Sequence, residues 1–463
     1  MAANDPDTGG LEIGALRHAY LDGSLSIVEL VDRVLDASTG WNDPALWISR
    51  VDETAIRERA HVLAAGAKTD PGLFARLPLY GIPFAVKDNI DVAGMPTTAA
   101  CPAFSYTPSR SAPVVERLLG AGAVLIGKTN LDQFATGLVG TRSPYGVPRN
   151  PFDPRYIPGG SSSGSAVAVS TGLISFALGT DTAGSGRVPA AFANIVGLKP
   201  TRGLLSIRGV VPACRSLDCV SVFALTAADA AVVFDVVAGF DPSDPLSRLP
   251  LAGGRQAFAP RFRFGVPAMR DLEFFGDHQA AALFAAAIES IEKVGGVAVK
   301  VRFAPFRDAG RLLYEGPWVA ERLDATEQLL DKNPEALLPI TRSIIERGRS
   351  YSAIDAFRAQ YELAALRREA ERELQTVDCL LLPTTGTIYE IAAVAAKPVR
   401  LNSNLGLYTN FANLLDLSAL AMPAGFRSNG LPFGISLLTP AFADHALLDL
   451  GARFEVLMRK GSK

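Results

Sequence analysis

Cysteine and histidine are scarce in this chain. The four cysteines are scattered through 463 residues and form no C-x-x-C pair, so we expect reduced thiols and neither a disulfide framework nor a zinc site. The four histidines lie in helical-looking or surface stretches, and none follows an apolar strand. A serine hydrolase of the usual kind needs a histidine base, so a serine–histidine pair is not expected here. The histidines are His18, His61, His278 and His445.

The sequence also lacks an excess of positive charge and a long apolar run. Lys and Arg total 45 against 47 Asp and Glu, so we expect no nucleic-acid partner and no membrane surface. Residues 156–180 are uncharged, but their glycines and serines make a poor membrane span, which needs ~20 apolar residues. Residues 1–10 lack the basic and apolar regions of a signal peptide, which predicts a cytoplasmic protein.

Short apolar strands alternate with amphipathic helices along most of the chain. Helical patterns occupy residues 1–70, strands and helices alternate over residues 77–305, and residues 306–376 are almost entirely helical and more charged. Strand patterns return over residues 377–463. This order predicts an α/β fold whose sheet is covered by helices on both faces and carries a helical insertion. No clear linker divides residues 1–463, so we expect a single domain.

Glycine, serine and threonine are concentrated in residues 158–200. Such a segment can cradle a phosphate, present a serine nucleophile or allow close backbone packing. Within this segment neither GGSSSGSA nor GTDTAGSGR is a Walker A loop, because neither has a Lys followed by Ser or Thr after its second glycine. Residues 160–164 match G-x-S-x-G, but a loop and not a strand precedes them, so the match is weak. Lys87, directly after the apolar residues 82–86, is a candidate base or an ordinary surface lysine.

Four motifs taken together resemble the amidase signature family. They are GIPFAVKDNIDVAG, PGGSSSGSAVAV, GTDTAGSGRVPAAFANIVGLKPTRG and GLPFGISLL. The resemblance covers residues 77–223 and resumes from residue 379 to the end of the chain. It implies the amidase signature fold, in which the central sheet is mixed, and it implies neither a cofactor nor a metal ion.

The resemblance implies a Ser-cisSer-Lys triad. By motif position the nucleophile is Ser185, the bridging serine is Ser161 after a cis peptide bond, and the base is Lys87. A neutral lysine base requires that burial lower its pKa from ~10.4 towards ~7. Asp181 and Arg187 are expected to brace the turn rather than touch the substrate. The residues implied to form the oxyanion hole through their N–H groups are Thr182, Ala183, Gly184 and Ser185.

Two further segments, VVPACRSLDCVSVFALT and YEGPWVAER, are similar to allophanate hydrolase within that family. In allophanate hydrolase a tyrosine and an arginine at this spacing hold the substrate carboxylate, which implies that Tyr314 and Arg322 do so here. Arginine presents a planar fork that suits a carboxylate. The alternative is that Arg322 is a surface residue of the helical insertion. Gly137 is expected to offer a main-chain contact to the substrate.

The resemblance implies hydrolysis of allophanate (urea-1-carboxylate) in urea degradation, with release of ammonia through an acyl-enzyme. A general amidase, a malonamate- or biuret-type hydrolase and the catalytic subunit of a tRNA-dependent amidotransferase remain alternatives, because they share the triad. We expect a small anionic amide as substrate, and the sequence allows a homodimer. Full-length allophanate hydrolases usually carry a further C-terminal domain, and this chain ends soon after its last predicted helix, so we expect a shortened or single-domain form.

Overall fold

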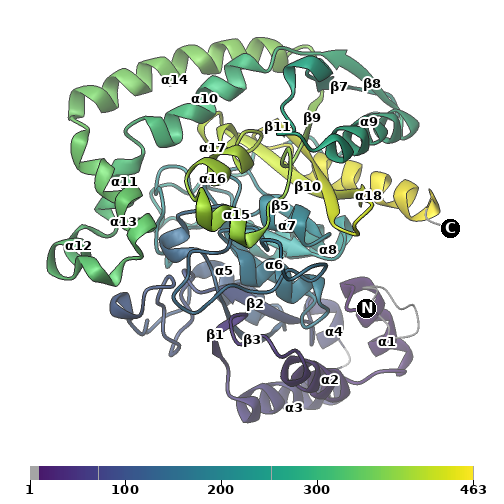
Figure 1. Ribbon diagram of the computed structural model, residues 1–463. Coiled ribbons are helices and arrows are strands. Elements are labelled where there is room, and N and C mark those ends of the chain that lie inside the picture. Colours follow the sequence, from purple (N-terminus) through teal and green to yellow (C-terminus); the bar gives the residue numbers. More distant parts are fainter. Residues whose placement is uncertain (1–9, 71, 252, 462–463) are drawn as a thin grey trace.

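An 11-stranded sheet runs through the computed structural model, which describes residues 10–70, 72–251 and 253–461 (Figure 1). The first nine residues, where we expect no signal peptide, lie outside the described residues. The strand order is β1-β3-β2-β4-β6-β5-β10-β11-β9-β7-β8. The strands are β1 Trp47–Arg50, β2 Pro83–Lys87, β3 Val124–Thr129, β4 Phe176–Asp181, β5 Val196–Lys199, β6 Cys219–Ala224, β7 Phe262–Val266, β8 Gly296–Lys300, β9 Cys379–Pro383, β10 Leu417–Phe426 and β11 Pro432–Pro440.

The sheet is mixed, as predicted. Strand β2 pairs in parallel with both β3 and β4, whereas β4 pairs with β6 in antiparallel register. Strands β2, β3, β4 and β6 are buried along their whole length, which explains why each is a short, almost continuous apolar run. Parallel β2 and β4 end at the same edge of the sheet, so Lys87 and Asp181, their last residues, lie at one edge.

Helices cover both faces of the sheet (Figure 1). Ser26 begins α2 through a capping box with Glu29, and Asp52 caps α3. The α-helices are α1 Ile13–Asp22, α2 Ile27–Gly40, α3 Glu53–Thr69, α4 Leu73–Arg76, α5 Pro113–Gly120, α6 Ser163–Ser170, α7 Val188–Phe192, α8 Ala227–Val237, α9 His278–Lys293, α10 Ala304–Glu315, α11 Val319–Asp324, α12 Glu327–Lys332, α13 Pro339–Ile345, α14 Ala353–Leu374, α15 Ile391–Ala396, α16 Arg400–Leu405, α17 Phe411–Leu414 and α18 Asp444–Gly461.

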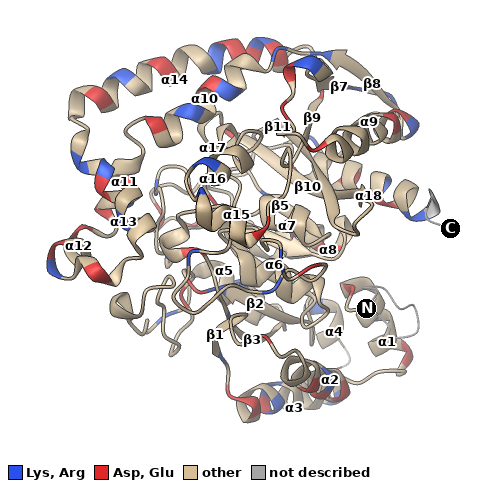
Figure 2. Cartoon of the chain, in the orientation of Figure 1, with Lys and Arg blue, Asp and Glu red and all other residues tan. Residues whose placement is uncertain are grey.

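The predicted helical insertion corresponds to helices α10 to α14. These helices lie along the upper and left edges of the molecule, and they carry many of its charged residues (Figures 1 and 2). The block begins at Ala304, close to the predicted start at residue 306. Helix α14 begins with a capping box between Ser352 and Asp355. The single-domain organisation stays a prediction.

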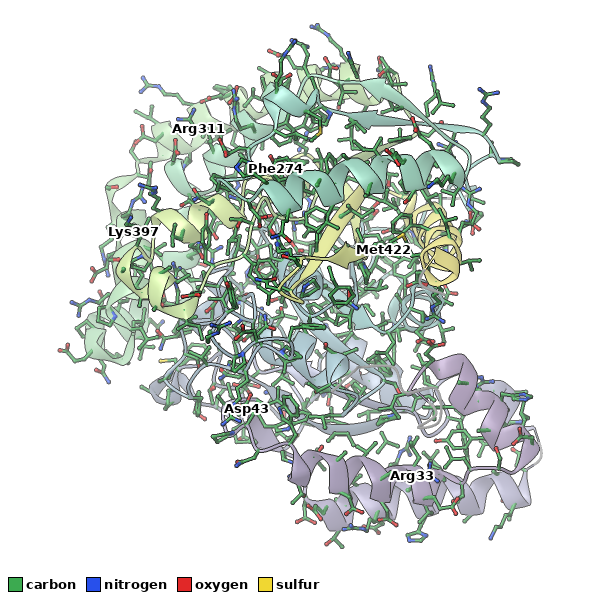
Figure 3. All side chains as sticks on the ribbon, turned by 45° about the vertical axis from the view of Figure 1, so that its right-hand side comes forward. Arg33, Asp43, Phe274, Arg311, Lys397 and Met422 are labelled. Carbon is green, nitrogen blue, oxygen red and sulfur yellow. The ribbon has the colours of Figure 1, made fainter. Side chains whose placement is uncertain are left out.

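Strand β10 and the short helices α15, α16 and α17 are elements that the sequence pattern did not predict. Strand β10 occupies the interior of the sheet between β5 and β11, and its Met422 is fully buried (Figure 3). Between residues 10 and 461, as far as they are described, every helix is too short or too polar to cross a lipid bilayer.

Candidate active site

Lys87 is buried among hydroxyl groups at the edge of the sheet. Its side chain is 0% exposed. Lys87 Nζ donates hydrogen bonds to Ser161 Oγ at 2.7 Å and to Thr180 Oγ1 at 2.8 Å. Thr180 belongs to β4, the parallel neighbour of β2, so the sheet itself joins these two side chains although they are far apart in sequence. The structure therefore brings the predicted base and the predicted bridging serine into direct contact.

The environment of Lys87 favours its neutral form. Burial lowers the pKa of Lys87 to about 7, although the charges of Asp132, Asp218 and Asp181 act in the opposite direction. Both hydrogen-bond partners of its Nζ are hydroxyls, which do not hold a positive charge as a paired carboxylate would. A substantial fraction of Lys87 is therefore unprotonated near neutral pH and able to accept a proton.

The predicted cis peptide bond is present between Gly160 and Ser161. Only glycine fits before the bridging serine, because a Cβ on Gly160 would lie 2.2 Å from Asp132 Oδ2 and 2.6 Å from the Gly140 nitrogen. The Asp132 N–H donates to the Ser161 carbonyl oxygen at 3.0 Å. Close packing of Asp132 thus fixes the backbone that carries Ser161.

Asp132 and Thr180 are contact residues that the sequence analysis missed. The Asp132 carboxylate accepts hydrogen bonds from the N–H groups of Gly140, at 2.9 Å, and Arg142, at 2.8 Å. Burial raises the pKa of Asp132, and the charge of Arg142 opposes this. Asp132 follows a strand, and Thr180 lies within the motif that begins GTDTAGSGR. Their position beside Lys87 and Ser161 becomes visible only in the folded sheet.

The loop after β4 carries Ser185. Asp181 accepts from the N–H groups of Gly184 at 2.8 Å and Gly186 at 3.0 Å, and it forms a buried ion pair with Arg187 at 2.9 Å. This confirms that Asp181 and Arg187 brace the turn. Ser185 is 3% exposed, and its Oγ makes no hydrogen bond to any other residue that the structure describes.

The four predicted oxyanion donors are not equivalent. The Gly184 N–H is predicted to bind the oxyanion, but it donates a hydrogen bond to the Asp181 carboxylate instead. In the described part of the chain, the N–H groups of Thr182, Ala183 and Ser185 find no protein acceptor. A Cβ on Gly184 would lie 2.4 Å from Thr409 Oγ1, so this glycine allows close packing. Three donors, not four, are free to bind a developing oxyanion.

Arg322 is buried beside two of the predicted substrate-binding positions. It lies on α11 and is 2% exposed. Its guanidinium donates to Thr136 Oγ1 at 3.1 Å and to the Tyr314 hydroxyl at 3.3 Å, and Thr136 directly precedes Gly137. The structure thus brings Tyr314, Arg322 and the segment of Gly137 together, and it contradicts the alternative that Arg322 is a surface residue.

Arg322 forms no ion pair with a described residue, although its charge acts on the buried carboxylate of Asp218. Its polar partners are the hydroxyls of Thr136 and Tyr314 and, at 3.4 Å, the carbonyl oxygen of Ala135. A buried charge is strongly unfavourable unless it is paired, so this position is suited to an anionic ligand. Arg322 also acts on Lys87: burial is the main cause that lowers the pKa of Lys87, and the charge of Arg322 adds to it.

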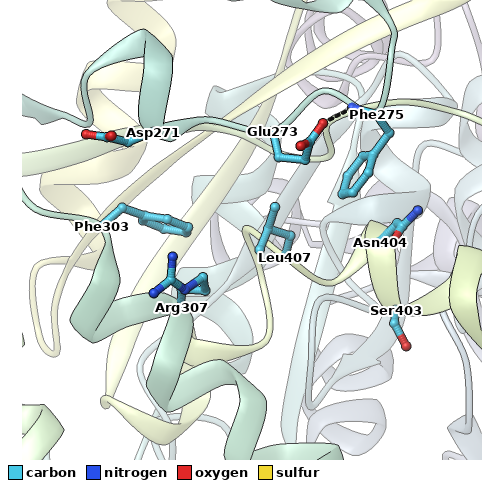
Figure 4. A pocket seen from close by; sticks show the side chains of 8 residues that line it. All are labelled: Asp271, Glu273, Phe275, Phe303, Arg307, Ser403, Asn404 and Leu407. Atoms are coloured by element: carbon cyan, nitrogen blue, oxygen red, sulfur yellow. Dashed lines mark hydrogen bonds between the residues drawn. The ribbon is translucent and has the colours of Figure 1, made fainter.

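Two cavities lie outside this arrangement. One, of about 320 Å³, is shown in Figure 4, where the Phe275 N–H donates to the Glu273 carboxylate. The other, of about 290 Å³, is lined in part by Ser216 and Asp218. Neither is lined by a residue of the predicted triad. The first cavity is bounded by Asp271, Glu273, Phe275, Phe303, Arg307, Ser403, Asn404 and Leu407.

Comparison with known proteins gives one family. The family model described as Amidase matches residues 29–448. The urea amidolyase of Saccharomyces cerevisiae is 43% identical over 100% of this chain. A glutamyl-tRNA(Gln) amidotransferase chain of a Synechococcus species is 32% identical over 96% of this chain and 97% of its own length. The solved allophanate hydrolase of Kluyveromyces lactis has a TM-score of 0.90 and 43% identity, over 96% of this chain and 72% of that chain.

The chain spans about a quarter of the length of the urea amidolyases that it matches. The similarity therefore concerns one part of those larger proteins. It extends over almost the whole chain described here, including the helical insertion that carries Tyr314 and Arg322.

Proposed function

Because the chain belongs to the amidase family, we propose that it hydrolyses allophanate, releasing ammonia from the terminal amide. The observation that carries this proposal is the buried, unpaired guanidinium of Arg322. Its positive charge helps to lower the pKa of Lys87, the residue that contacts Ser161. A substrate with a carboxylate next to its amide would supply the missing negative charge. The similarity to allophanate hydrolase and to urea amidolyases over nearly the whole chain supports the same substrate.

In the proposed reaction, neutral Lys87 accepts a proton through Ser161 from the hydroxyl of Ser185. Ser185 Oγ attacks the carbonyl carbon of the terminal amide, and the free N–H groups of the loop, those of Thr182 and Ala183 among them, stabilise the resulting oxyanion. The proton returns to the leaving nitrogen, which departs as ammonia. Water activated by the same residues then cleaves the acyl-enzyme, so that N-carboxycarbamate is the product.

The main rival is a glutamine-using amidase, since the glutamyl-tRNA(Gln) amidotransferase chain is similar over nearly its whole length. Ammonia release by the purified chain should be measured with allophanate, biuret, malonamate and glutamine under identical conditions. We expect allophanate to give the highest kcat/KM. Turnover of glutamine without turnover of allophanate would overturn the proposal.

We expect Arg322→Gln to lower kcat/KM for allophanate by about 100-fold, because it removes charge-assisted hydrogen bonds worth roughly 3 kcal/mol. Biuret is a neutral analogue in which an amide replaces the carboxylate, so its kcat/KM should change much less. The measurement is the ratio of the two kcat/KM values in wild type and variant.

Arg311→Gln is the matched control. Arg311 lies in the same helical insertion, but it is largely exposed and pairs with Glu315 on the surface. This variant should keep the wild-type ratio. If Arg322→Gln reduced kcat/KM for allophanate and biuret equally, Arg322 would not bind the carboxylate.

We also propose that the protein works in the cytoplasm on a small dissolved anion, without a nucleic-acid or membrane partner. The four cysteines are free and buried, and the net charge is −2, which is compatible with this setting. A homodimer stays a prediction.

A further inference from the structure

Asp218 contacts the loop that carries the free N–H groups. Its Oδ1 accepts a hydrogen bond from Thr182 Oγ1 at 2.5 Å, and Asp218 is only 5% exposed. Thr182 is the first residue after β4 and one of the residues whose N–H has no described acceptor. The side chain of Thr182 is thus held by a group that takes no part in the proposed proton transfer.

Asp218 is itself held by the backbone of its own loop. Its carboxylate accepts from the N–H groups of Ala213, at 2.9 Å, and Cys214, at 3.2 Å. Burial raises the pKa of Asp218 to about 6, while the hydrogen bonds from Thr182 and the two N–H groups favour the charged form. Above that pH the carboxylate is an acceptor only, so the Thr182 hydroxyl must donate to it.

A second contact joins the same two loops. The side-chain amide of Asn413 donates to the carbonyl oxygens of Asp181 and Leu217, each at 2.8 Å. These carbonyls directly precede Thr182 and Asp218 along the chain. The peptide unit that presents the Thr182 N–H is therefore linked to the 213–218 loop twice, by its own carbonyl through Asn413 and by the Thr182 hydroxyl through Asp218.

The 213–218 loop also contacts the helix that carries Arg322. The Ser216 N–H and hydroxyl donate to the Glu321 carboxylate, at 2.7 Å and 2.5 Å. Cys214 Sγ lies 3.7 Å from the carbonyl oxygen of Trp318, in the turn before α11. One loop thus connects the substrate-anion position to the oxyanion position.

We propose that Asp218 is a positioning residue, which holds the Thr182 N–H towards the oxyanion and links that donor through the 213–218 loop to the helix of Arg322. The inference rests on the proposed amide hydrolysis by Ser185. A hydrogen-bond donor stabilises a transition state only when it is aimed in advance at the developing charge, and it is worth about 10²- to 10³-fold in kcat. Displacing that donor without removing it should have a smaller effect.

The sharpest test replaces the hydroxyl and keeps the shape. Thr182→Val removes the hydrogen bond to Asp218 at nearly constant volume, whereas Thr182→Ser keeps it. We expect Thr182→Val to lower kcat by about 10- to 100-fold with KM almost unchanged, and Thr182→Ser to restore most of the activity. Rates are expressed per active site, counted with a serine-reactive fluorophosphonate, so that unfolded protein does not contribute.

Thr201→Val is the matched control. Thr201 is also a buried threonine whose hydroxyl bonds to an aspartate, Asp444, at 2.7 Å, but it lies outside the proposed site. Its replacement should lower Tm and leave kcat per active site unchanged. If Thr182→Val behaved in the same way, the contact with Asp218 would only stabilise the fold and the inference would be wrong.

The role of Asp218, which accepts the hydrogen bond from Thr182, is tested separately. Asp218→Ala, which leaves the Thr182 hydroxyl without its acceptor, should reproduce the loss of kcat, and the double variant with Thr182→Val should be little worse than either single variant, because both remove one interaction. Additive losses would overturn the inference. The rate at which the fluorophosphonate modifies Ser185 should fall in parallel with kcat, and this readout stays valid if allophanate proves not to be the substrate. Failure of the substrate proposal is therefore distinguishable from failure of this one.

Discussion

Replacing Ser185 by alanine is expected to reduce kcat for amide hydrolysis to background, a loss of about 10⁴-fold or more. Without the Ser185 hydroxyl no acyl-enzyme can form, and the base and oxyanion donors alone leave only weak catalysis. Ammonia release from allophanate is the direct measurement. Mass spectrometry after acid quenching should detect an acyl adduct on the peptide that contains Ser185 in wild type, and none in the variant.

Ser163→Ala is the matched control for this experiment. Ser163 lies in the same glycine- and serine-rich region, is 0% exposed, and its hydroxyl has no hydrogen-bond partner in the described structure. The same chemical change there should leave kcat within about twofold of wild type, since it removes no hydrogen bond. A loss as large as that of Ser185→Ala, or an active Ser185→Ala variant, would refute the assignment of the nucleophile.

Much of this site could be predicted because its residues lie at the ends of apolar strands or within motifs that resemble a known family. Lys87 ends an apolar run that a buried strand explains, and the structure shows it as the last residue of β2. The resemblance to the amidase family then supplied a partner for it in Ser161, and the two side chains are in contact. A pattern of this kind identifies residues at the ends of strands, where side chains from distant segments meet.

The hydrogen bonds within the loop could not be predicted, because they depend on its backbone conformation. The Gly184 N–H was expected to face an oxyanion, but Asp181 is placed to accept from it. Thr180 contacts Lys87 only because β2 and β4 are parallel neighbours, which no local pattern reports. The same holds for Thr182 and Asp218, which belong to different loops.

Strand β10 was missed for a different physical reason. Its sequence, LSALAMPAGF, contains small residues and a proline, which are weak strand formers. The strand exists because β5 and β11 pair with it on both sides, and the register shifts between Pro423 and Phe426, where the proline is accommodated. Tertiary pairing outweighs local preference at this position.

Lys87→Met should lower kcat by about 10³-fold or more, because it removes the only proposed base and keeps a side chain of similar length. Neutral Lys87 is the active form, so kcat/KM of the wild type should rise with pH as Lys87 loses its proton, with a midpoint set by its pKa of about 7. The residual activity of the variant should show no such rise. If the variant kept the same rise, another group would have to be the base.

The same pKa shift makes a prediction about stability. In the unfolded chain Lys87 keeps its proton up to its ordinary pKa of 10.5, whereas burial lowers its pKa to about 7 in the folded chain. Between these values the unfolded state binds more protons, so the contribution of Lys87 destabilises the fold most at or below pH 7 and fades as the pH rises. Lys87→Met should therefore exceed the wild type in Tm by more at pH 7 than at pH 9. An equal Tm difference at both pH values would mean that burial does not hold Lys87 neutral, and the lysine would then already carry the proton that it is proposed to accept from Ser185.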